Sequence, residues 1–351
     1  MQHVLDLYGI HKSDCTIKTF GNGLINNTWI VHTKQSSYIL QKINKEVFTN
    51  PQLIDENIQL INDYLKKINP SFFFISPLPS LNGKTMVCYE DEFYRLFRFI
   101  SSKTFLVFED ATIAFEAAKQ FGKFTRGLSD FTIDELYETI PHFHDLHLRY
   151  KQFLQAIENA DEQRLHLSEK IIIALQKHKI IVDVYDDISK NASFKKRVTH
   201  HDTKISNVLF DEDNKGIAVI DLDTVMPGYF ISDVGDMLRT YLSPVSEEEI
   251  NFELISVRDE YFNAVAKGYL SEMKAELSIE EINAFVYAGK FMIYMQALRF
   301  IADYLNNDIY YGAKYPLQNF NRAQNQLRLL ELLIEKEERY NLIVQQVAKQ
   351  R

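Results

Sequence analysis

The segment VTHHDTKISNVLF and the segment GIAVIDLDT that soon follows it constrain the fold more than any other feature of the chain. Their apolar runs, at 208–210 and 216–220, are joined by the turn-rich connector DEDNK, a pattern that predicts a β-hairpin. The strands of a hairpin run in opposite directions, so residues before the first strand and after the second lie at the same end. The sequence therefore predicts that Asn207 and Asp221 lie close together.

The polar residues around this hairpin suit phosphoryl transfer with a bound metal ion. Asp221 and Asp223 are two residues apart and, on an extended strand, point to the same side. Mg²⁺ prefers carboxylate and amide oxygens and takes further oxygens from a substrate phosphate. The parts of such a reaction are an aspartate that accepts a hydroxyl proton (Asp202), a lysine that neutralises the phosphoryl group (Lys204), and Mg²⁺ held by Asn207 and Asp221.

Two other hypotheses use the same residues. A dinuclear metallohydrolase binds its metal ions through histidine and carboxylate ligands, which here would be His200, His201, Asp202, Asp221 and Asp223. Lys204 has no use beside two metal ions, which weakens this hypothesis. A catalytically inactive kinase-like binding module is disfavoured because Asp202, Asn207 and Asp221 are all present. Release of ADP that requires an added acceptor distinguishes a kinase from both.

Composition sets the class of protein and of partner. The chain has 351 residues, of which 46% are apolar, enough for two lobes with cores of their own. Its net charge of -9 argues against nucleic acid, which requires a concentrated basic face. No run of 18 uncharged apolar residues occurs, and the first residues lack the basic start and apolar stretch of a signal peptide. The sequence therefore predicts a protein without membrane partners. Its only cysteines, Cys15 and Cys88, fit a reducing compartment, so we expect it in the cytoplasm. Its oligomeric state stays open, and a monomer is plausible.

The first hundred residues show mainly the pattern of strands, with one helical interruption. CTIKTFGNGLINNTWIVHTKQSSYILQKI contains three apolar runs broken by glycine, asparagine and serine, and an Asn82-Gly83 turn is expected between two further strands. The helix begins at Pro51 and carries an apolar stripe of Ile54, Ile58, Ile61 and Leu65. The rest of the chain has mostly helical spacing. We therefore expect a nucleotide-binding β lobe at 1–100 and a helical catalytic and substrate-binding lobe at 101–351.

HHDTKISNVLF, VIDLDTVMPG and SDVGDMLR together resemble the catalytic core of the aminoglycoside phosphotransferase and choline kinase-like superfamily, relatives of protein kinases. IDLDTVMPG and RFIADYLNNDIYY are similar to its N-acetylhexosamine 1-kinase branch, and the likeness covers nearly the whole chain. The resemblance implies an α+β, protein kinase-like two-lobe fold with a small antiparallel β N-lobe and a large helical C-lobe. It also implies ATP as the phosphate donor and Mg²⁺ as a cofactor.

The resemblance also assigns roles to residues of the core. It implies that Asp202 is the catalytic base and that Lys204 contacts the transferred phosphate. Asn207 and Asp221 are implied to hold Mg²⁺. Asp223 is either a second metal contact or a structural hydrogen-bonding residue, and both alternatives stay open.

Two residues are expected to support the catalytic loop without touching the substrate. His200 lies behind the loop, and Asp233 matches the superfamily aspartate that braces it. Only eleven residues separate Asp221 from Asp233, too few for the phosphorylatable activation segment of a protein kinase, and no Ala-Pro-Glu follows. The acceptor is therefore expected to be a small molecule.

The nucleotide side of the predicted site lies in the β lobe. Gly21 and Gly23 fall between two strand-like runs, where missing side chains let backbone N–H groups approach phosphates, and an ordinary hairpin turn is the alternative. The family likeness favours nucleotide binding. Lys42 on the third strand is expected to pair with Glu56, which shares a helical stripe with two leucines and so faces inward. Whether Gln41 or Lys42 faces ATP stays open.

The acceptor side rests on the resemblance, which implies that a sugar is held by Arg239, Arg299, Asp303 and Tyr310, together with Asp202. The expected reaction transfers phosphate from ATP to the C1 hydroxyl of N-acetylglucosamine or N-acetylgalactosamine, giving a sugar 1-phosphate. The preferred hexosamine and the anomer stay open. The alternative acceptors are other small alcohols of the aminoglycoside, choline or ethanolamine, or homoserine type.

Overall fold

The computed structural model describes residues 1–21, 25–107 and 109–350. The chain divides into two compact units. The first, here called the β unit, comprises Met1–Lys103, Asp130–Pro141 and Leu209–Pro227; the second, the helical unit, comprises Thr104–Ser129, His142–Val208 and Gly228–Arg351. The predicted α+β class is confirmed by an N-terminal antiparallel sheet and a large helical C-terminal region. The assignment of nucleotide binding to 1–100 and catalysis to 101–351 stays a prediction.

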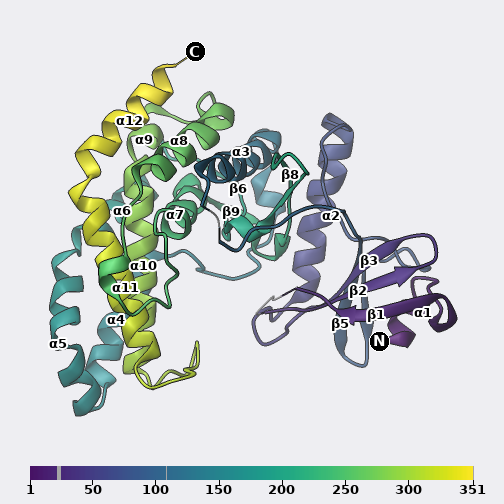
Figure 1. Cartoon of the computed structure of the whole chain (residues 1–351), viewed down its shortest axis with the longest axis horizontal. Coiled ribbons are helices and arrows are strands. Elements are labelled where there is room, and N and C mark those ends of the chain that lie inside the picture. The colour runs from purple at the N-terminus through teal and green to yellow at the C-terminus, as the bar shows by residue number, and fades with distance from the viewer. Residues whose placement is uncertain (22–24, 108, 351) are drawn as a thin grey trace. The chain divides into compact units, whose positions relative to one another are not determined.

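The β unit is built on one five-stranded antiparallel sheet (Figure 1). Its order is β1-β2-β3-β5-β4, with bounds Cys15–Thr19 for β1, Asn27–Thr33 for β2, Ser37–Lys42 for β3, Met86–Tyr89 for β4 and Glu92–Arg98 for β5. Alternate side chains of a strand face opposite sides of a sheet. One side therefore buries a cluster that includes Val31, Leu40 and Leu96, against which the short helix α1 (Gln2–Asp6) packs through Val4 and Leu5.

The hairpin between β4 and β5 turns at a place that the sequence did not indicate. Its turn residues are Glu90 and Asp91, whose φ angles of 51° and 60° lie in the left-handed region that tight two-residue hairpins require. The Asn82-Gly83 turn exists, with Gly83 at φ 83°, but it precedes β4 instead of separating two strands. The expected position was therefore wrong, because the Asn-Gly pair is a strong turn signal, whereas neither residue of the actual turn is a glycine.

The helix of the β unit follows its apolar spacing. α2 (Pro51–Ile68) begins at the expected proline and buries Ile54, Ile58, Ile61 and Leu65, as predicted. Asn57 is buried on the same face, and its side-chain nitrogen donates to the carbonyls of Tyr137 (2.8 Å) and Val225 (3.0 Å). α2 thus holds two later segments of the chain within the β unit. The predicted hairpin also forms, from β7 (Val208–Phe210) and β8 (Gly216–Val219).

The helical unit surrounds one long apolar helix, α10 (Phe285–Leu305), which is buried on nearly every side and packs against α4, α7 and α11 (Figure 1). α3 packs against α8, where Gly268 is required because a Cβ there would lie 2.3 Å from the carbonyl oxygen of Phe115. β6 (Lys196–Thr199) pairs with β9 (Met226–Tyr229), the last two residues of which belong to this unit. The remaining helices are α3 (Ala111–Gly127), α4 (Leu146–Asn159), α5 (Glu162–Lys177), α6 (Ile180–Lys190), α7 (Phe230–Tyr241), α8 (Asp259–Met273), α9 (Ile279–Asn283), α11 (Gln318–Glu335) and α12 (Glu337–Lys349).

Among the helices of the described chain, none combines the length and the apolar character that crossing a membrane would require.

Candidate active site

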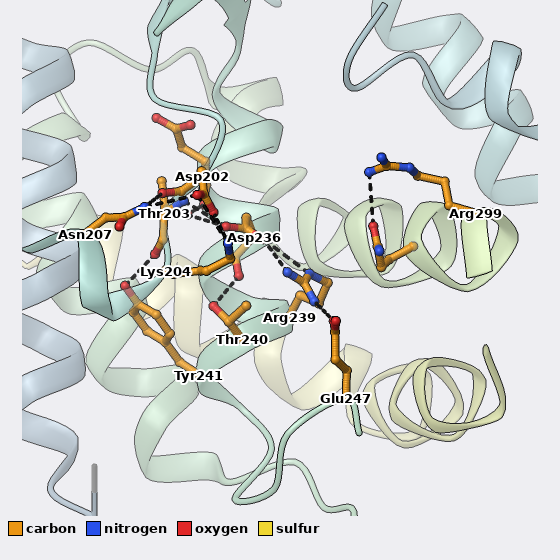
Figure 2. A network of polar contacts seen from close by, with 12 residues as sticks. Asp202, Thr203, Lys204, Asn207, Asp236, Arg239, Thr240, Tyr241, Glu247 and Arg299 are labelled. Atoms are coloured by element: carbon orange, nitrogen blue, oxygen red, sulfur yellow. Dashed lines mark hydrogen bonds and ion pairs between the residues drawn. The ribbon is translucent and has the colours of Figure 1, made fainter. Parts of the chain in front are cut away.

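The loop that follows β6 brings three of the predicted residues together (Figure 2). The Lys204 ammonium lies 2.9 Å from Oδ1 of Asp202. Asn207, at the end of the short 3₁₀ helix η3 (Ile205–Asn207), donates its side-chain N–H groups to the carbonyl (2.9 Å) and Oδ2 (3.1 Å) of Asp202. The Asp202 carboxylate is thus fixed from two sides and is still partly exposed, as an acceptor of a substrate proton must be.

Lys204 keeps its charge in this position. Burial disfavours the ammonium form, but the negative charges of Asp202 and Asp236 outweigh it and raise the pKa of Lys204. A lysine with a raised pKa is a stable positive charge beside the reacting carboxylate. It can therefore neutralise a phosphoryl group during transfer.

Asp233 on α7 fixes the loop from behind. Its carboxylate accepts the backbone N–H groups of His200 (3.0 Å) and His201 (2.8 Å). Burial raises the pKa of Asp233 to about 7, although these N–H groups act in the opposite direction. His200 is fully buried and packs against the ring of Phe121, with ring centroids 5.2 Å apart. Both residues thus occupy internal, supporting positions.

The backbone of His201 is in the left-handed region, with φ 64°. Gly228 makes room for its ring, because a Cβ on Gly228 would lie 2.5 Å from Nε2 of His201 and 2.3 Å from Oγ1 of Thr199. The left-handed conformation costs a residue with a Cβ roughly 1–2 kcal/mol, so contacts with surrounding residues must hold His201 in it. The path of the chain just before Asp202 is therefore determined by packing.

A second set of buried polar residues holds the other end of the loop (Figure 2). Asp236 accepts the backbone N–H of Thr203 (2.8 Å), and the Tyr241 hydroxyl donates to the Thr203 carbonyl (2.7 Å). Arg239, expected to contact substrate, forms ion pairs with Asp236 (3.0 Å) and Glu247 (2.7 Å). Burial opposes the charge of Arg239, but these carboxylates outweigh it and raise its pKa. Arg239 thus has internal partners, and its contact with a substrate stays a prediction.

Arg299 and Tyr310, predicted on the acceptor side, lie next to each other. The Arg299 guanidinium donates to the Tyr310 hydroxyl (3.4 Å) and lies 5.8 Å from the ring centre of Phe143. The described part of the chain offers it no carboxylate within ion-pair distance. Tyr310 is 72% exposed. An arginine surrounded by aromatic rings and lacking a carboxylate partner can hydrogen-bond a polar ligand.

Asp303, also predicted on the acceptor side, has partners inside the helical unit. It is buried, and its carboxylate accepts the backbone N–H groups of Tyr310 (2.8 Å) and Tyr311 (3.0 Å) and a side-chain N–H of Asn319 (3.1 Å). Both oxygens are therefore engaged in holding the loop that follows α10. Contact of Asp303 with a substrate stays a prediction, whereas its hold on the loop is a feature of the structure.

Two basic residues that sequence reasoning missed, Arg149 and His144, adjoin Arg299. Burial, together with the nearby Arg299 charge, lowers the pKa of Arg149. Burial lowers the pKa of His144 well below its usual value, and His201, Arg299 and Arg149 add to this effect. The ring of His144 lies 5.1 Å from that of His201. Two guanidinium groups, Arg149 and Arg299, thus lie near a histidine ring that contacts the residue before Asp202.

In the β unit, only one of the two predicted loop glycines can be assessed. Gly21 has φ 76°, a conformation that glycine adopts readily, and a Cβ there would meet no atom within 4 Å. Gly23 lies outside the described residues. Nucleotide binding by this segment stays a prediction.

The predicted ion pair between Lys42 and Glu56 was wrong. Lys42 lies 3.2 Å from Glu92 of the neighbouring β5, and Glu56 is exposed. The buried stripe of α2 passes through Asn57, which places Glu56 on another side of the helix. Gln41 points to the opposite side of the sheet from Lys42, and its side-chain oxygen accepts from Arg95.

Asp223, left open between two roles, has the geometry of a structural residue. It is 2% exposed and forms an ion pair of 2.5 Å with Arg95, while its other oxygen accepts from Asn26 (2.7 Å). Both oxygens thus have protein neighbours, and a metal contact of Asp223 stays a prediction. Asp221, two residues earlier, has φ 61° and precedes the 3₁₀ helix η4 (Leu222–Thr224).

Comparison with known proteins identifies the family. Residues 16–270 match the phosphotransferase enzyme family. The chain belongs to this family. The match includes β1–β5, the loop after β6 and the β7–β8 hairpin, so it covers every predicted residue from Gly21 to Arg239.

Solved structures confirm the kinase-like fold of this phosphotransferase. It is similar to a spectinomycin phosphotransferase in complex with ADP and spectinomycin (TM-score 0.62, 15% identity, 96% of this chain and 97% of that chain). It is also similar to a microcompartment-associated aminopropanol kinase (TM-score 0.63, 13% identity, 97% and 98%). A third similar structure is an ethanolamine kinase from Plasmodium vivax (TM-score 0.59, 15% identity, 95% and 87%). These likenesses extend over nearly the full length of each chain.

Asn207 offers an oxygen of the type that a hard divalent cation prefers. Asn207 turns its N–H groups toward Asp202, and its oxygen Oδ1 accepts no hydrogen bond from a described residue. Amide and carboxylate oxygens are the donor types that Mg²⁺ prefers, and binding of Mg²⁺ by Asn207 and Asp221 stays a prediction. No three histidine, cysteine or carboxylate side chains of the described ranges are grouped around a metal-sized position, as a dinuclear hydrolase would require.

Sequence reasoning missed Arg95, Asn26 and Asp236. The sequence does contain an indication of Arg95. It alternates with Phe93 and Phe97, which places it on the aromatic side of β5, and a charged residue on an apolar side of a sheet needs an internal partner. Asp236 also follows Asp233 by three residues, which places both on one face of α7. Asn26 left no comparable signal.

Proposed function

We propose that this phosphotransferase transfers the γ-phosphate of ATP to the anomeric C1 hydroxyl of an N-acetylhexosamine, giving a sugar 1-phosphate. The observation that carries the chemistry is the loop after β6, where Asp202 lies between Lys204 and the amide of Asn207. A partly exposed carboxylate, an adjacent ammonium group and a metal-type oxygen are the parts that phosphoryl transfer requires.

The predicted site residues have separate roles in the proposed phosphoryl transfer. The Asp202 carboxylate accepts the proton of the sugar hydroxyl as the oxygen attacks phosphorus. The Lys204 ammonium contacts the transferred phosphoryl group and offsets its negative charge. Asn207 and Asp221 would hold Mg²⁺, which when bound neutralises charge on the phosphates of ATP. Asp233 keeps the loop in place through the backbone and has no contact with the reaction.

Charge on the acceptor side supports a neutral acceptor. Burial and the nearby Arg299 charge lower the pKa of Arg149, and no described carboxylate lies within ion-pair distance of Arg299. A further cation about 6 Å from such a group costs roughly 3 kcal/mol at an effective dielectric constant near 20. An N-acetylhexosamine carries no charge, and its hydroxyl and amide oxygens can accept N–H groups from Arg299.

The second candidate is a kinase of an amino alcohol or an aminoglycoside, with choline and homoserine as related acceptors. The fold likeness to the spectinomycin, aminopropanol and ethanolamine enzymes supports it. Most of these acceptors are cations at neutral pH, and the charge around Arg299 disfavours them. The neutral sugar is therefore the better proposal.

Two free cysteines support the cytoplasm as the compartment in which this reaction takes place. Cys15 and Cys88 form no disulfide with each other. ATP and reduced thiols occur together in the cytoplasm. Fractionation of cells that express the tagged chain tests this proposal.

The decisive experiment measures ADP release with ATP and Mg²⁺ across N-acetylglucosamine, N-acetylgalactosamine, glucose, ethanolamine, choline, homoserine and spectinomycin. We expect turnover with an N-acetylhexosamine that is at least tenfold higher than with any amine. Phosphorus NMR then identifies the product, because a 1-phosphate couples to the anomeric proton. A 6-phosphate product, or turnover of amines alone, would refute the sugar 1-kinase. The Asp202→Asn variant serves as the inactive control.

A further inference from the structure

A buried arginine links the sheet of the β unit to the segment that carries Asp221. Arg95 on β5 is 1% exposed. Its Nε and Nη2 donate to Oε1 of Gln41 on β3, at 3.0 and 2.9 Å, and its Nη1 lies 2.5 Å from Oδ1 of Asp223. The planar guanidinium therefore binds a strand residue with one edge and the segment after β8 with its remaining nitrogen.

Both carboxylate oxygens and the carbonyl of Asp223 have a neighbour within the β unit. Its second carboxylate oxygen accepts from Asn26 at 2.7 Å, and its carbonyl accepts from the Thr139 hydroxyl at 2.8 Å. Asn26 is itself held, because its side-chain oxygen accepts the backbone N–H of Asn44 at 3.0 Å. The anchoring of Asp223 thus draws on strand residues and on the loop after β3.

A buried ion pair of this kind is retained for geometry. Removing two charges from water costs about as much as their attraction returns, so an apolar pair of the same volume would stabilise the fold equally well. What the apolar pair lacks is direction: two N–H groups of Arg95 donate to Oε1 of Gln41 and fix the guanidinium plane, and its Nη1 then lies beside Oδ1 of Asp223. Arg95 and Asp223 therefore determine where the chain runs two residues after Asp221.

The backbone of Asp221 needs such a constraint. Its φ of 61° is one that residues with a Cβ rarely adopt, and the segment relaxes unless its neighbours hold it. Asp223 is held by Arg95, and the carbonyl of Val225 accepts from Asn57 of α2 at 3.0 Å. Asp221 thus lies at the start of a stretch that is fixed at two points within the same unit.

We propose that Arg95 is a positioning residue for the divalent cation: through Asp223 it fixes the backbone that presents the Asp221 carboxylate. This rests on the proposed function, in which Asp221 holds Mg²⁺. Arg95 touches neither the metal nor the substrate. Its removal should therefore weaken the metal site while Asp221 itself is unchanged.

A double-mutant cycle on metal affinity tests the proposal. Binding of Mn²⁺ in the presence of ADP is measured by electron paramagnetic resonance for the unmodified chain, Arg95→Met, Asp223→Asn and the double variant. We expect each single variant to bind Mn²⁺ about tenfold more weakly. The double variant should be no weaker than the weaker single variant, because the two residues act as one unit. The matched control is Asp91→Asn, which removes an exposed ion pair with Lys45 on the same sheet and should bind Mn²⁺ normally.

The outcome that overturns the proposal is weak Mn²⁺ binding in Asp223→Asn with normal binding in Arg95→Met, because Asp223 would then act without Arg95. If Arg95→Met does not fold, Arg95→Lys is used instead, because lysine keeps the positive charge but lacks the planar guanidinium with its several N–H donors. Normal Mn²⁺ binding by Arg95→Lys would also refute the proposal.

Amide hydrogen exchange separates this proposal from the proposed function. Exchange at 220–225 should become at least tenfold faster in both single variants, with exchange in α10 unchanged. If the unmodified chain binds no Mn²⁺ with ADP, the proposed function fails. Faster exchange would then still support the positioning of the segment by Arg95, and unchanged exchange would refute it.

Discussion

The carboxylate of Asp233 accepts the backbone N–H groups of two successive residues, His200 at 3.0 Å and His201 at 2.8 Å. The next residue is Asp202, the proposed base. Successive N–H groups point in one direction only when the backbone departs from an extended strand, and His201 has φ 64°. A single buried carboxylate on α7 therefore determines the direction in which the chain delivers Asp202.

The same carboxylate makes stability depend on pH. Burial raises the pKa of Asp233 from 3.8 to about 7. Between these values the native state keeps a proton that the unfolded chain releases, so its contribution to stability falls as pH rises, by up to about 1.4 kcal/mol per pH unit. Asparagine does not titrate, so the Asp233→Asn variant lacks this fall in stability. We therefore expect the unfolding free energy of the unmodified protein to fall relative to that of Asp233→Asn as pH rises from 4 to 7. Urea denaturation at four pH values measures it, and parallel curves would contradict the prediction.

Replacing the proposed base tests the chemistry directly. Asp202→Asn keeps the bonds of Asn207 to the loop and removes the proton acceptor, so kcat should fall by about 10²- to 10⁴-fold. ADP affinity, measured by calorimetry, should change less than threefold. Near-normal turnover in this variant would rule out Asp202 as the base.

Removing the proposed metal ligand should affect nucleotide binding through the cation. Asp221→Ala should abolish the Mg²⁺-dependent part of ATP affinity, because the metal bridges protein and phosphate oxygens. The control is Asp213→Ala, an exposed aspartate in the β7–β8 connector. Calorimetry with and without Mg²⁺ separates the two, and unchanged MgATP affinity in Asp221→Ala would place the cation elsewhere.

Gly228 should tolerate no side chain. In Gly228→Ala the new methyl group would lie within 2.5 Å of both the His201 ring and the Thr199 hydroxyl, so either the ring or the loop must shift. We expect a loss of about 2–3 kcal/mol in stability, typical of overpacking, and at least tenfold lower kcat. Thermal denaturation and steady-state kinetics measure both. A variant with normal stability and turnover would show that the ring of His201 moves freely.

Arg299 should determine acceptor affinity without affecting the nucleotide. Arg299→Gln removes the donor fork and one positive charge, so KM for the N-acetylhexosamine should rise at least tenfold while KM for MgATP stays within twofold. Turnover of ethanolamine, if any, should increase as the repulsion weakens. The control is Arg328→Gln, an exposed arginine on α11. Equal changes in both Michaelis constants would argue for a structural role.

Much of the fold could be predicted because its signals are local. The apolar stripe of α2 and the β7–β8 hairpin each lie within one continuous stretch, and the chain forms them as their spacing indicates. The β4–β5 turn was misplaced because left-handed φ angles at Glu90 and Asp91 are imposed by the pairing of the strands, and neither residue is a glycine. Residue type alone carries no record of that pairing.

The candidate site divides in the same way. Asp202, Lys204 and Asn207 lie within six residues, so their proximity follows from the chain itself. The partner of Lys42 depends on which strand lies next to β3, and that strand is β5, which carries Glu92. The ion pair between Arg95 and Asp223 joins residues more than a hundred positions apart, which spacing cannot reveal.

The hold of Asp303 on the loop after α10 has a consequence for how acceptor preference can change. Its carboxylate binds the backbone N–H groups of Tyr310 and Tyr311 and makes no use of their side chains. Ile309 and Tyr310 are 81% and 72% exposed, so their side chains can be exchanged while the loop keeps its course. Directed evolution toward a new acceptor should therefore begin at these two positions and leave Asp303 untouched.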